Sequence, residues 1–316
     1  MTRDSNYDLY KKQKSSKLKQ VRHILEFVVV VIVKTVTGLF TIRMNQKLGV
    51  WFGKLAYRLA KKDRGIAQYQ LDFCFPELTA EKRSGIIKAT FENTGKTLFE
   101  ALAIAKIRKH PEKWIKLTNS EIIYKALESK NGAVLLFGHL GNWELLPIIY
   151  DMLNIKGIAV ESPIGDNRLD ELLLSVRKSD NIAMVPRGDR SSARSILSCF
   201  RNNEVFLYAF DQDTRVKSVF VDFFGRKAAT AKGAATLAQK FNAPVISAFG
   251  ARLDNGTHLY NFELLSEAPY EGTAEEELEL TRQYTTALER HIRQYPTQWV
   301  WFHRRWKTQP GEIEEK

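Results

Sequence analysis

The sequence predicts an α/β fold: a mixed, largely parallel central sheet flanked by helices, with an N-terminal helical region that associates with a membrane. Three observations support this prediction. Between about residues 44 and 130 the apolar residues recur at helical spacing, and beyond Ala133 short apolar runs alternate with segments of helical period. Such alternation is typical of a sheet covered by helices. The third observation is a long apolar stretch just after a lysine-rich N-terminus.

The N-terminal region begins with a basic extension, residues 1–22, which is followed by an apolar segment, residues 23–43. No cleavage site of a removable signal peptide follows. The central Lys34 costs about +2.5 to +3.5 kcal/mol in a bilayer, while each Val, Ile, Leu or Phe contributes about −0.3 to −0.6 kcal/mol, so spanning is close to balanced. Basic residues continue on both sides, and we therefore expect a membrane-associating helix that lies in the membrane surface. The alternative is a buried core segment.

Residues 44–310 are expected to form one domain, because no internal repeat, low-complexity tract or linker interrupts them. A capping box from Thr273 to Glu276 predicts the start of a last helix, which Pro296 ends. Strands are predicted at AVLLF, GIAVE, IAMV, VFLYAF, PVISAF and LYNFELL, and helices at 167–179, 191–201 and 230–241.

The composition bounds the location and the partners of the chain. Its 316 residues carry a formal net charge of +12 and include two cysteines. Cys74 and Cys199 cannot form a disulfide framework and lack a zinc-binding spacing, which favours the cytoplasm. The charge indicates an acidic partner: nucleic acid, anionic lipid, a phosphorylated substrate or an acidic carrier protein.

The stretch FGHLGNWELL, residues 137–146, indicates chemistry. It predicts a buried strand, a turn that holds His139, and a helix capped by Asn142. His139 and Glu144 are five residues apart, about 140° around a continuous helix, so they meet only if the histidine lies in the turn and the glutamate in the first helical turn. A carboxylate there would hold the imidazole tautomer and leave the other ring nitrogen to take a proton from an attacking hydroxyl. N–H groups at the helix start could also stabilise an oxyanion.

The spacing alone leaves a second interpretation open. His139 would then be a turn residue, and Glu144 a favourable charge at a helix N-terminus. No metal site is expected, since H-E-x-x-H is absent and no second histidine stands near enough to complete a ligand set.

Further motifs accompany HLGNWE: CFPEL at 74–78, DQD at 211–213, VFVDFFGRKAAT at 219–230 and PTQWVWFHRRWK at 296–307. In this order they resemble the lipid A late acyltransferases, the lauroyl and myristoyl transferases of the lysophospholipid acyltransferase superfamily. The resemblance runs over about residues 20–310. The sequence departs from the family pattern at Asp222, where proline is common, and in its lysine-rich extension. These departures bear on the acceptor and the acyl length rather than on the reaction.

The resemblance implies that 44–310 is an acyltransferase domain in which His139 is the catalytic base and Glu144 orients it. It implies transfer of a fatty acyl chain from acyl carrier protein to a hydroxyl of a Kdo-bearing lipid A precursor, at the cytoplasmic face of the bacterial inner membrane. The carrier thioester is a co-substrate, and no cofactor or metal is expected. The acidic carrier protein, the anionic glycolipid acceptor and the membrane surface all suit a chain of charge +12, and nucleic acid is not expected.

Four charged residues are candidates for substrate binding. Arg177 stands where the family has a functionally implicated arginine, and it would pair with an acceptor phosphate or support the site, unless it is a solvated helix residue. Arg187 follows a predicted strand and would act likewise. Asp211 and Asp213 follow the strand VFLYAF, at a position where ligands bind in α/β sheets. They would orient the acceptor or a basic side chain, or else form a turn.

Asn142 and Trp143, within HLGNWE, are further candidates for substrate binding. Arg304 and Arg305 lie among tryptophans in WVWFHRRW, a composition that suits a lipid headgroup interface or the stacking of single-stranded nucleic acid. Core packing of the tryptophans is the alternative.

Other functions stay open. Glycerolipid acyltransferases usually carry an F-P-E-G-T-R block downstream of the histidine motif, whereas FPEL lies upstream of it here. The alternatives are an enzyme that acylates another glycolipid or a lysophospholipid, and a non-catalytic basic protein that binds membrane surfaces or nucleic acid.

Overall fold

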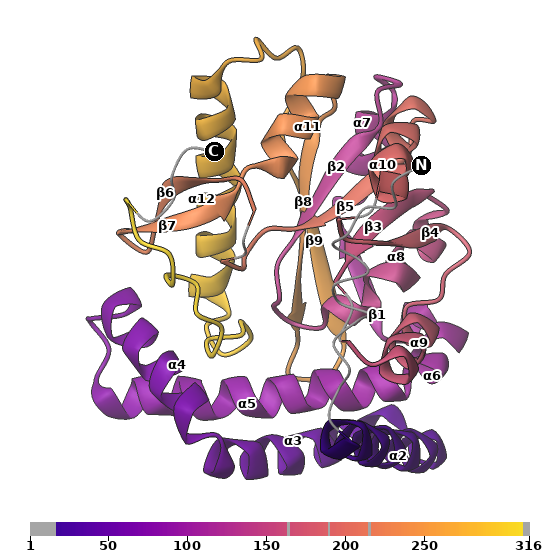
Figure 1. Cartoon of the computed structure of the whole chain (residues 1–316), viewed down its shortest axis with the longest axis vertical. Helices are drawn as coiled ribbons and strands as arrows, with labels where there is room; N and C mark the ends of the chain where they lie inside the picture. The colour runs from indigo at the N-terminus through magenta and orange to yellow at the C-terminus, as the bar shows by residue number, and fades with distance from the viewer. Residues whose placement is uncertain (1–16, 163–164, 189, 214–215, 312–316) are drawn as a thin grey trace.

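The computed structural model describes residues 17–162, 165–188, 190–213 and 216–311. It confirms the predicted α/β fold, with a mixed, largely parallel sheet between helices (Figure 1). Residues 1–16, which make up most of the expected basic extension, lie outside the described part of the chain.

The main sheet has seven strands in the order β1-β9-β8-β2-β5-β3-β4. Neighbouring strands are parallel except for β8 and β9. Each apolar run chosen from the sequence forms one of these strands, whereas the short β1 was not expected. The strands are β1 (Ile115–Thr118), β2 (Ala133–Phe137), β3 (Gly157–Glu161), β4 (Ile182–Pro186), β5 (Val205–Ala209), β8 (Val245–Arg252) and β9 (His258–Ser266).

Alternate side chains of β2 point to opposite faces of the sheet and enter two separate cores. Val134 and Leu136 join the core under α10 (Arg190–Arg201), α11 (Gly233–Phe241) and α12 (Ala274–Gln294). Leu135 joins the core under α7 (Glu121–Leu127) and α8 (Leu146–Leu153). Burial on both faces explains why these strands are apolar throughout.

A two-stranded antiparallel hairpin, β6 (Ser218–Phe223) and β7 (Arg226–Ala231), lies outside the main sheet and was not expected from the sequence. Helix α11 consequently begins at Gly233 rather than near residue 230. Phe223 of the hairpin packs on Trp299 and Trp306, with ring centroids 5.8 and 5.3 Å apart. The hairpin therefore fixes the C-terminal tryptophan motif to the body of the protein.

Helices α3 (Ile42–Leu59), α4 (Lys61–Cys74) and α5 (Ala80–Leu102) lie across one end of the sheet (Figure 1). The FPEL stretch separates α4 from α5, as expected, and Thr79 caps α5. Gly49 of α3 and Gly95 of α5 face each other, and a Cβ on either would overlap the backbone of the other helix. This close approach fixes α3 against α5. The short α6 (Ile104–Lys109) and a 3₁₀ turn (Pro111–Lys113) then lead into β1.

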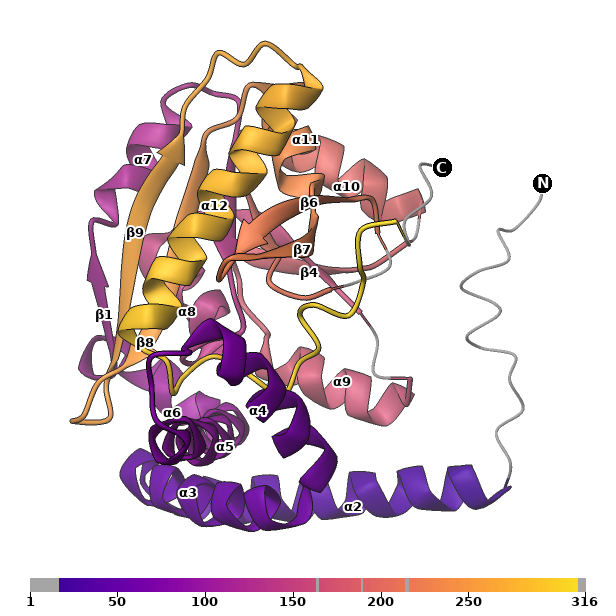
Figure 2. The ribbon, with the colours of Figure 1, turned by 90° about the vertical axis from the view of Figure 1, so that its left-hand side faces the viewer.

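Helix α2 (Lys17–Leu39) turns away from the direction of α3: α3 lies lengthwise in Figure 1, where α2 is seen end-on, and α2 lies lengthwise in Figure 2, where it projects beyond the sheet. One face of α2 contacts the start and end of α9 (Asn167–Val176): His23 Nδ1 lies 3.3 Å from Asp166 Oδ2, and Lys34 Nζ lies 3.3 Å from Ser175 Oγ. No helix in the described ranges is long and apolar enough to cross a bilayer. Membrane association of residues 23–43 stays a prediction.

Candidate active site

His139 lies in a turn just past the carboxyl end of β2. The predicted order of strand, turn and helix is confirmed, because β2 ends at Phe137 and Asn142 caps a 3₁₀ turn, Trp143–Leu145, that leads into α8. The Asn142 Oδ1 accepts the Glu144 N–H at 3.1 Å. The N–H groups of Glu144, Leu145 and Leu146 all have acceptors within the turn, so these three are already occupied as donors to an oxyanion.

The carboxylate of Asp211 holds His139 from two sides. Asp211 Oδ1 lies 2.8 Å from His139 Nδ1, and Oδ2 accepts the backbone N–H of His139 at 2.7 Å. Trp299 Nε1 donates to the same Oδ2 at 2.9 Å. An ionised carboxylate only accepts hydrogen bonds, so Nδ1 of the neutral ring carries the proton and donates the hydrogen bond to Asp211. The side-chain amide nitrogen of Gln212 also lies beside Nδ1, at 3.2 Å. The ring is about a quarter exposed, at 24%, and no partner of Nε2 is recorded among the described residues.

The register of the sheet explains this pair. Phe137 of β2 and Ala209 of β5 are direct neighbours in parallel strands. His139 and Asp211 each lie two residues beyond that pair, so both reach the same edge of the sheet. Parallel neighbours thus bring together two residues that are 72 positions apart in the chain.

Burial and charge set the ionisation of this pair. Burial alone would lower the pKa of His139, but the charge and hydrogen bond of Asp211, helped by Glu144, outweigh it and raise the pKa. Burial would raise the pKa of Asp211, and His139, the backbone and Trp299 instead lower it to about 2. Asp211 is therefore ionised near neutral pH, and it stabilises the imidazolium that forms when Nε2 takes a proton.

Glu144 does not hold the His139 ring, contrary to the expectation from the family resemblance. Its carboxylate accepts two hydrogen bonds from Arg177, at 2.7 Å to Oε1 and 2.8 Å to Oε2, and one from Trp143 Nε1 at 3.0 Å. The cap by Asn142 places Glu144 in the 3₁₀ turn, from which its side chain reaches Arg177 just past α9. Glu144 contributes charge near His139, while the orienting partner of the imidazole is Asp211.

Arg177 supports the site rather than standing free for a phosphate. Besides its two bonds to Glu144, its Nη1 lies 3.3 Å from Glu161 Oε2 at the end of β3. Burial acts to lower the pKa of Arg177, but the two carboxylates outweigh it and raise the pKa. The guanidinium is therefore charged and already paired with Glu144 and Glu161. Trp143 packs edge-on against the His139 ring with centroids 5.2 Å apart, so the turn forms one side of the site.

The remaining candidates lie apart from His139 or are inaccessible. Asn142 is fully buried, and Arg305 is fully buried and donates to Ala229 O at 2.6 Å, so neither contacts a substrate from this position. Burial lowers the pKa of Arg305 to about 10. Asp213 accepts from the backbone N–H of Thr308 at 2.6 Å and so ties down the C-terminal segment.

Arg187 and Arg304 are exposed. Burial, which keeps Arg305 from contacting a substrate, therefore does not apply to these two arginines. Trp299 and Trp301 are 1% and 0% exposed, so the headgroup interface expected at this motif is wrong for both: they are core residues. One of them, Trp299, still serves the site through its bond to Asp211.

A concave region of about 310 Å³ lies between α12 and strands β8 and β9. Its lining includes Ser247, Asn261, Arg290 and His291 but neither His139 nor Asp211. It is therefore separate from the dyad.

Replacing Glu144 by glutamine tests its role separately from that of Asp211. Glu144→Gln leaves Arg177 without one ionised partner and is expected to lower turnover, because the turn loses its anchor to α9. The acid limb of the pH profile is expected to shift only slightly downward, since Asp211 still supports the imidazolium. A steady-state profile of kcat/KM against pH checks this. A shift as large as that of Asp211→Asn would restore Glu144 as the main partner of His139.

The fold and the pair define a class of site: in an α/β fold, a histidine that is hydrogen-bonded to a buried carboxylate lies at the carboxyl edge of a largely parallel sheet, an arrangement that can act as a general base. Residues 11–308 match the family described as bacterial lipid A biosynthesis acyltransferase, and the chain belongs to this family. The predicted resemblance is thereby confirmed.

Individual relatives agree in class and differ in the acyl group that their names specify. The lipid A biosynthesis lauroyltransferase of Escherichia coli (strain K12) is 29% identical over 271 residues, which cover 84% of this chain and 86% of the relative. The palmitoleoyltransferase of the same strain is 25% identical over 266 residues, covering 83% and 85%. A lipid A biosynthesis acyltransferase of Haemophilus influenzae is 28% identical over 261 residues, covering 82% and 79%.

Proposed function

We propose that this protein transfers a fatty acyl chain from acyl carrier protein to a hydroxyl of a Kdo-bearing lipid A precursor. The observation that carries the proposal is the His139–Asp211 pair, with Nδ1 bound to the carboxylate and no recorded partner of Nε2 among the described residues. Membership of the lipid A acyltransferase family supports the acceptor class.

The dyad accounts for the chemistry in two proton transfers. Nε2 takes the proton of the acceptor hydroxyl while the oxygen attacks the thioester carbonyl, and Asp211 stabilises the resulting imidazolium. As the tetrahedral intermediate collapses, the C–O ester bond stays and the C–S bond breaks. The imidazolium then returns its proton to the leaving thiolate of the carrier. Acyl carrier protein is acidic, so a chain of charge +12 attracts it as well as the anionic acceptor.

Incubation of the purified protein with acyl carrier protein thioesters and a panel of acceptors tests this function. The panel contains a Kdo-bearing lipid A precursor, the same precursor without Kdo, another glycolipid and a lysophospholipid. Mass spectrometry is expected to show an added acyl chain on the first acceptor at the highest rate. Preferred acylation of a lysophospholipid, or none of any acceptor, would contradict the proposal.

We also propose that α2 and α3 rest on the cytoplasmic face of the inner membrane. Leu25, Val29 and Ile32 are 56–61% exposed on the face of α2 opposite to the α9 contact, and Lys34 points to the protein. On α3, Trp51 is 66% exposed. The two helices together present an apolar surface suited to the interface of a bilayer.

Trp51→Ala is expected to weaken binding to vesicles of phosphatidylethanolamine and phosphatidylglycerol about tenfold, since a tryptophan at the interface supplies much of the apolar contact. Tyr124→Ala is the matched control, because Tyr124 is also an exposed aromatic residue, at 48%, but lies on α7. Sedimentation with vesicles measures both. Equal binding by the two variants would count against α3 as a membrane contact.

A further inference from the structure

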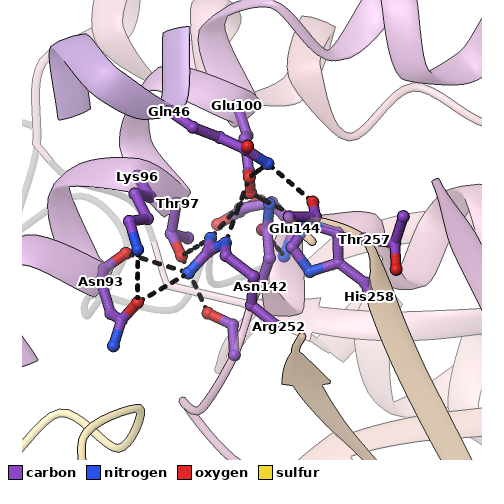
Figure 3. A network of polar contacts seen from close by, with 12 residues as sticks. Gln46, Asn93, Lys96, Thr97, Glu100, Asn142, Glu144, Arg252, Thr257 and His258 are labelled. Carbon is purple, nitrogen blue, oxygen red and sulfur yellow. Dashed lines mark hydrogen bonds and ion pairs between the residues drawn. The ribbon is translucent and has the colours of Figure 1, made fainter. Parts of the chain in front are cut away.

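A buried carboxylate behind the active-site turn joins helices and strands that are distant in sequence. Glu100 on α5 is 0% exposed (Figure 3). Its Oε1 accepts from Gln46 Nε2 at 2.7 Å, and its Oε2 accepts from Asn142 Nδ2 at 2.7 Å. The guanidinium of Arg252, at the end of β8, lies 2.7 Å from Oε2, and His258 Nε2 lies 3.2 Å from it.

Glu100 fixes which way the Asn142 amide faces. A carboxylate accepts hydrogen bonds and donates none, so the NH₂ of Asn142 must point toward Glu100. The amide oxygen then points the opposite way, where it accepts the Glu144 N–H at 3.1 Å. One buried charge therefore determines the cap of the 3₁₀ turn that carries Trp143 and Glu144.

Arg252 fixes a second hydrogen bond in the same manner. Its Nη2 donates to Thr97 Oγ1 at 3.0 Å. A guanidinium has no acceptor, so the Thr97 hydroxyl proton is left to donate to the Gly141 carbonyl, at 2.8 Å. Gly141 has a φ of +62°, and a Cβ there would lie 2.5 Å from the Gly250 carbonyl oxygen. The turn is thus held at two successive residues, Gly141 and Asn142.

The charge on Glu100 persists despite its burial. Burial acts to raise the pKa of this carboxyl, but Arg252 and His258 outweigh it and lower the pKa. Buried ion pairs contribute little net stability compared with apolar residues of the same volume, so stability alone is a weak reason for this pair. Directing two hydrogen bonds onto the catalytic turn is a use that apolar residues do not provide.

We propose that the Glu100–Arg252 ion pair positions the active-site turn, acting through Asn142 and Thr97 to hold Glu144 and Trp143 beside His139. These are positioning residues and not catalytic ones, since neither Glu100 nor Arg252 contacts His139. The inference rests on the proposed function of the His139 site.

Asn142→Asp tests the direction of the hydrogen bond. The pKa of the introduced carboxyl group is expected to be raised by burial and by the charge of Glu100. When protonated, it donates to Glu100 and accepts from the Glu144 N–H, which preserves the turn. When ionised, it repels Glu100. Its kcat is therefore expected to fall at least about tenfold as the pH rises through this new ionisation, over a range in which the wild-type kcat stays level. A profile parallel to that of the wild type would overturn the proposal.

Gln46→Ala is the matched control, because it removes a bond of equal length to the same carboxylate without touching the turn. Asn142→Ala is expected to lower kcat about tenfold with little change in KM, and Gln46→Ala to stay within about twofold of the wild type. Equal losses of kcat in the two variants would overturn the positioning role. If Asn142→Asp does not fold, the comparison of Asn142→Ala with Gln46→Ala tests the proposal in its place.

Deuterium exchange of the turn amides separates this inference from the proposed function. Without substrate, Asn142→Ala is expected to exchange faster than Gln46→Ala at the Glu144 amide. Identical exchange would contradict the positioning role even if acyl transfer is observed. Faster exchange would support it even if the wild type acylates none of the acceptors tested, a result that counts only against the proposed function.

Discussion

His139→Ala is expected to lower the rate of acyl transfer by about 10²–10⁴-fold, the contribution of a positioned general base. The variant lacks the imidazole that Asp211 holds at the sheet edge, which is the group proposed to take a proton from the acceptor. Purified protein, a saturating carrier thioester and a lipid A precursor give the rate. The proposed membrane contacts, on α2 and α3, lie on other elements, so vesicle binding is expected to be unchanged.

His110→Ala is the matched control for this experiment. His110 is a histidine with a 60% exposed side chain that lies between α6 and the following 3₁₀ turn. It is expected to keep wild-type activity. Thermal unfolding of both variants guards against loss of structure, since His139→Ala leaves the buried carboxylate of Asp211 without one of its hydrogen-bond donors. Full activity in a folded His139→Ala would overturn the mechanism.

Asp211→Asn is expected to cost about 10²–10⁴-fold in kcat, since the amide no longer fixes the proton on Nδ1. The pH profile provides a second signature. Asp211 raises the pKa of His139, so in the wild type the base is neutral, and active, only above a raised pKa. The substitution lowers that pKa, and the acid limb of kcat/KM is expected to move to lower pH while the plateau falls.

The pH profile also distinguishes the role of Asp211 from that of Glu144. Both carboxylates raise the pKa of His139, but Asp211 also makes the hydrogen bond. The downward shift is therefore expected to be larger for Asp211→Asn than for Glu144→Gln. An acid limb that does not move in Asp211→Asn would show that Asp211 does not set the ionisation of the base.

Local signals predicted local structure well. The apolar run before His139 predicted β2, and Asn142 and Thr273 were identified as caps, because a cap depends on residues within one turn of the chain. Strand β1 and the β6–β7 hairpin were missed because they depend on distant segments that they pack on, which local signals do not include.

The partner of His139 could not be read from the sequence, because it depends on which strand lies beside β2. The family resemblance pointed to Glu144, five residues away, whereas the sheet places Asp211 beside His139 through the β2–β5 register. The position of Asp211 at the end of a strand was the available signal, and it indicated a role in the site. Glu100 gave no signal, since a single glutamate in a helix is usually solvated.

Composition misled at the C-terminus. The mixture of tryptophan and arginine in WVWFHRRW is the same whether the residues face lipid or core, and here Arg305 and Trp301 are fully buried. Tryptophan and arginine each combine a long apolar part with a polar end, so they suit a lipid surface as well as a protein core. Only the packing of this motif against the β6–β7 hairpin shows that it lies in the core.

The state of the His139 ring is the most direct test of the dyad. Nitrogen-15 NMR of protein labelled on its histidine side chains, with His139 assigned by its absence in His139→Ala, reports both the tautomer and the pKa. The expected result is a neutral ring that carries its proton on Nδ1, with a pKa above the ordinary value of about 6.5. A proton on Nε2, or a pKa below the ordinary value, would contradict a base oriented by Asp211.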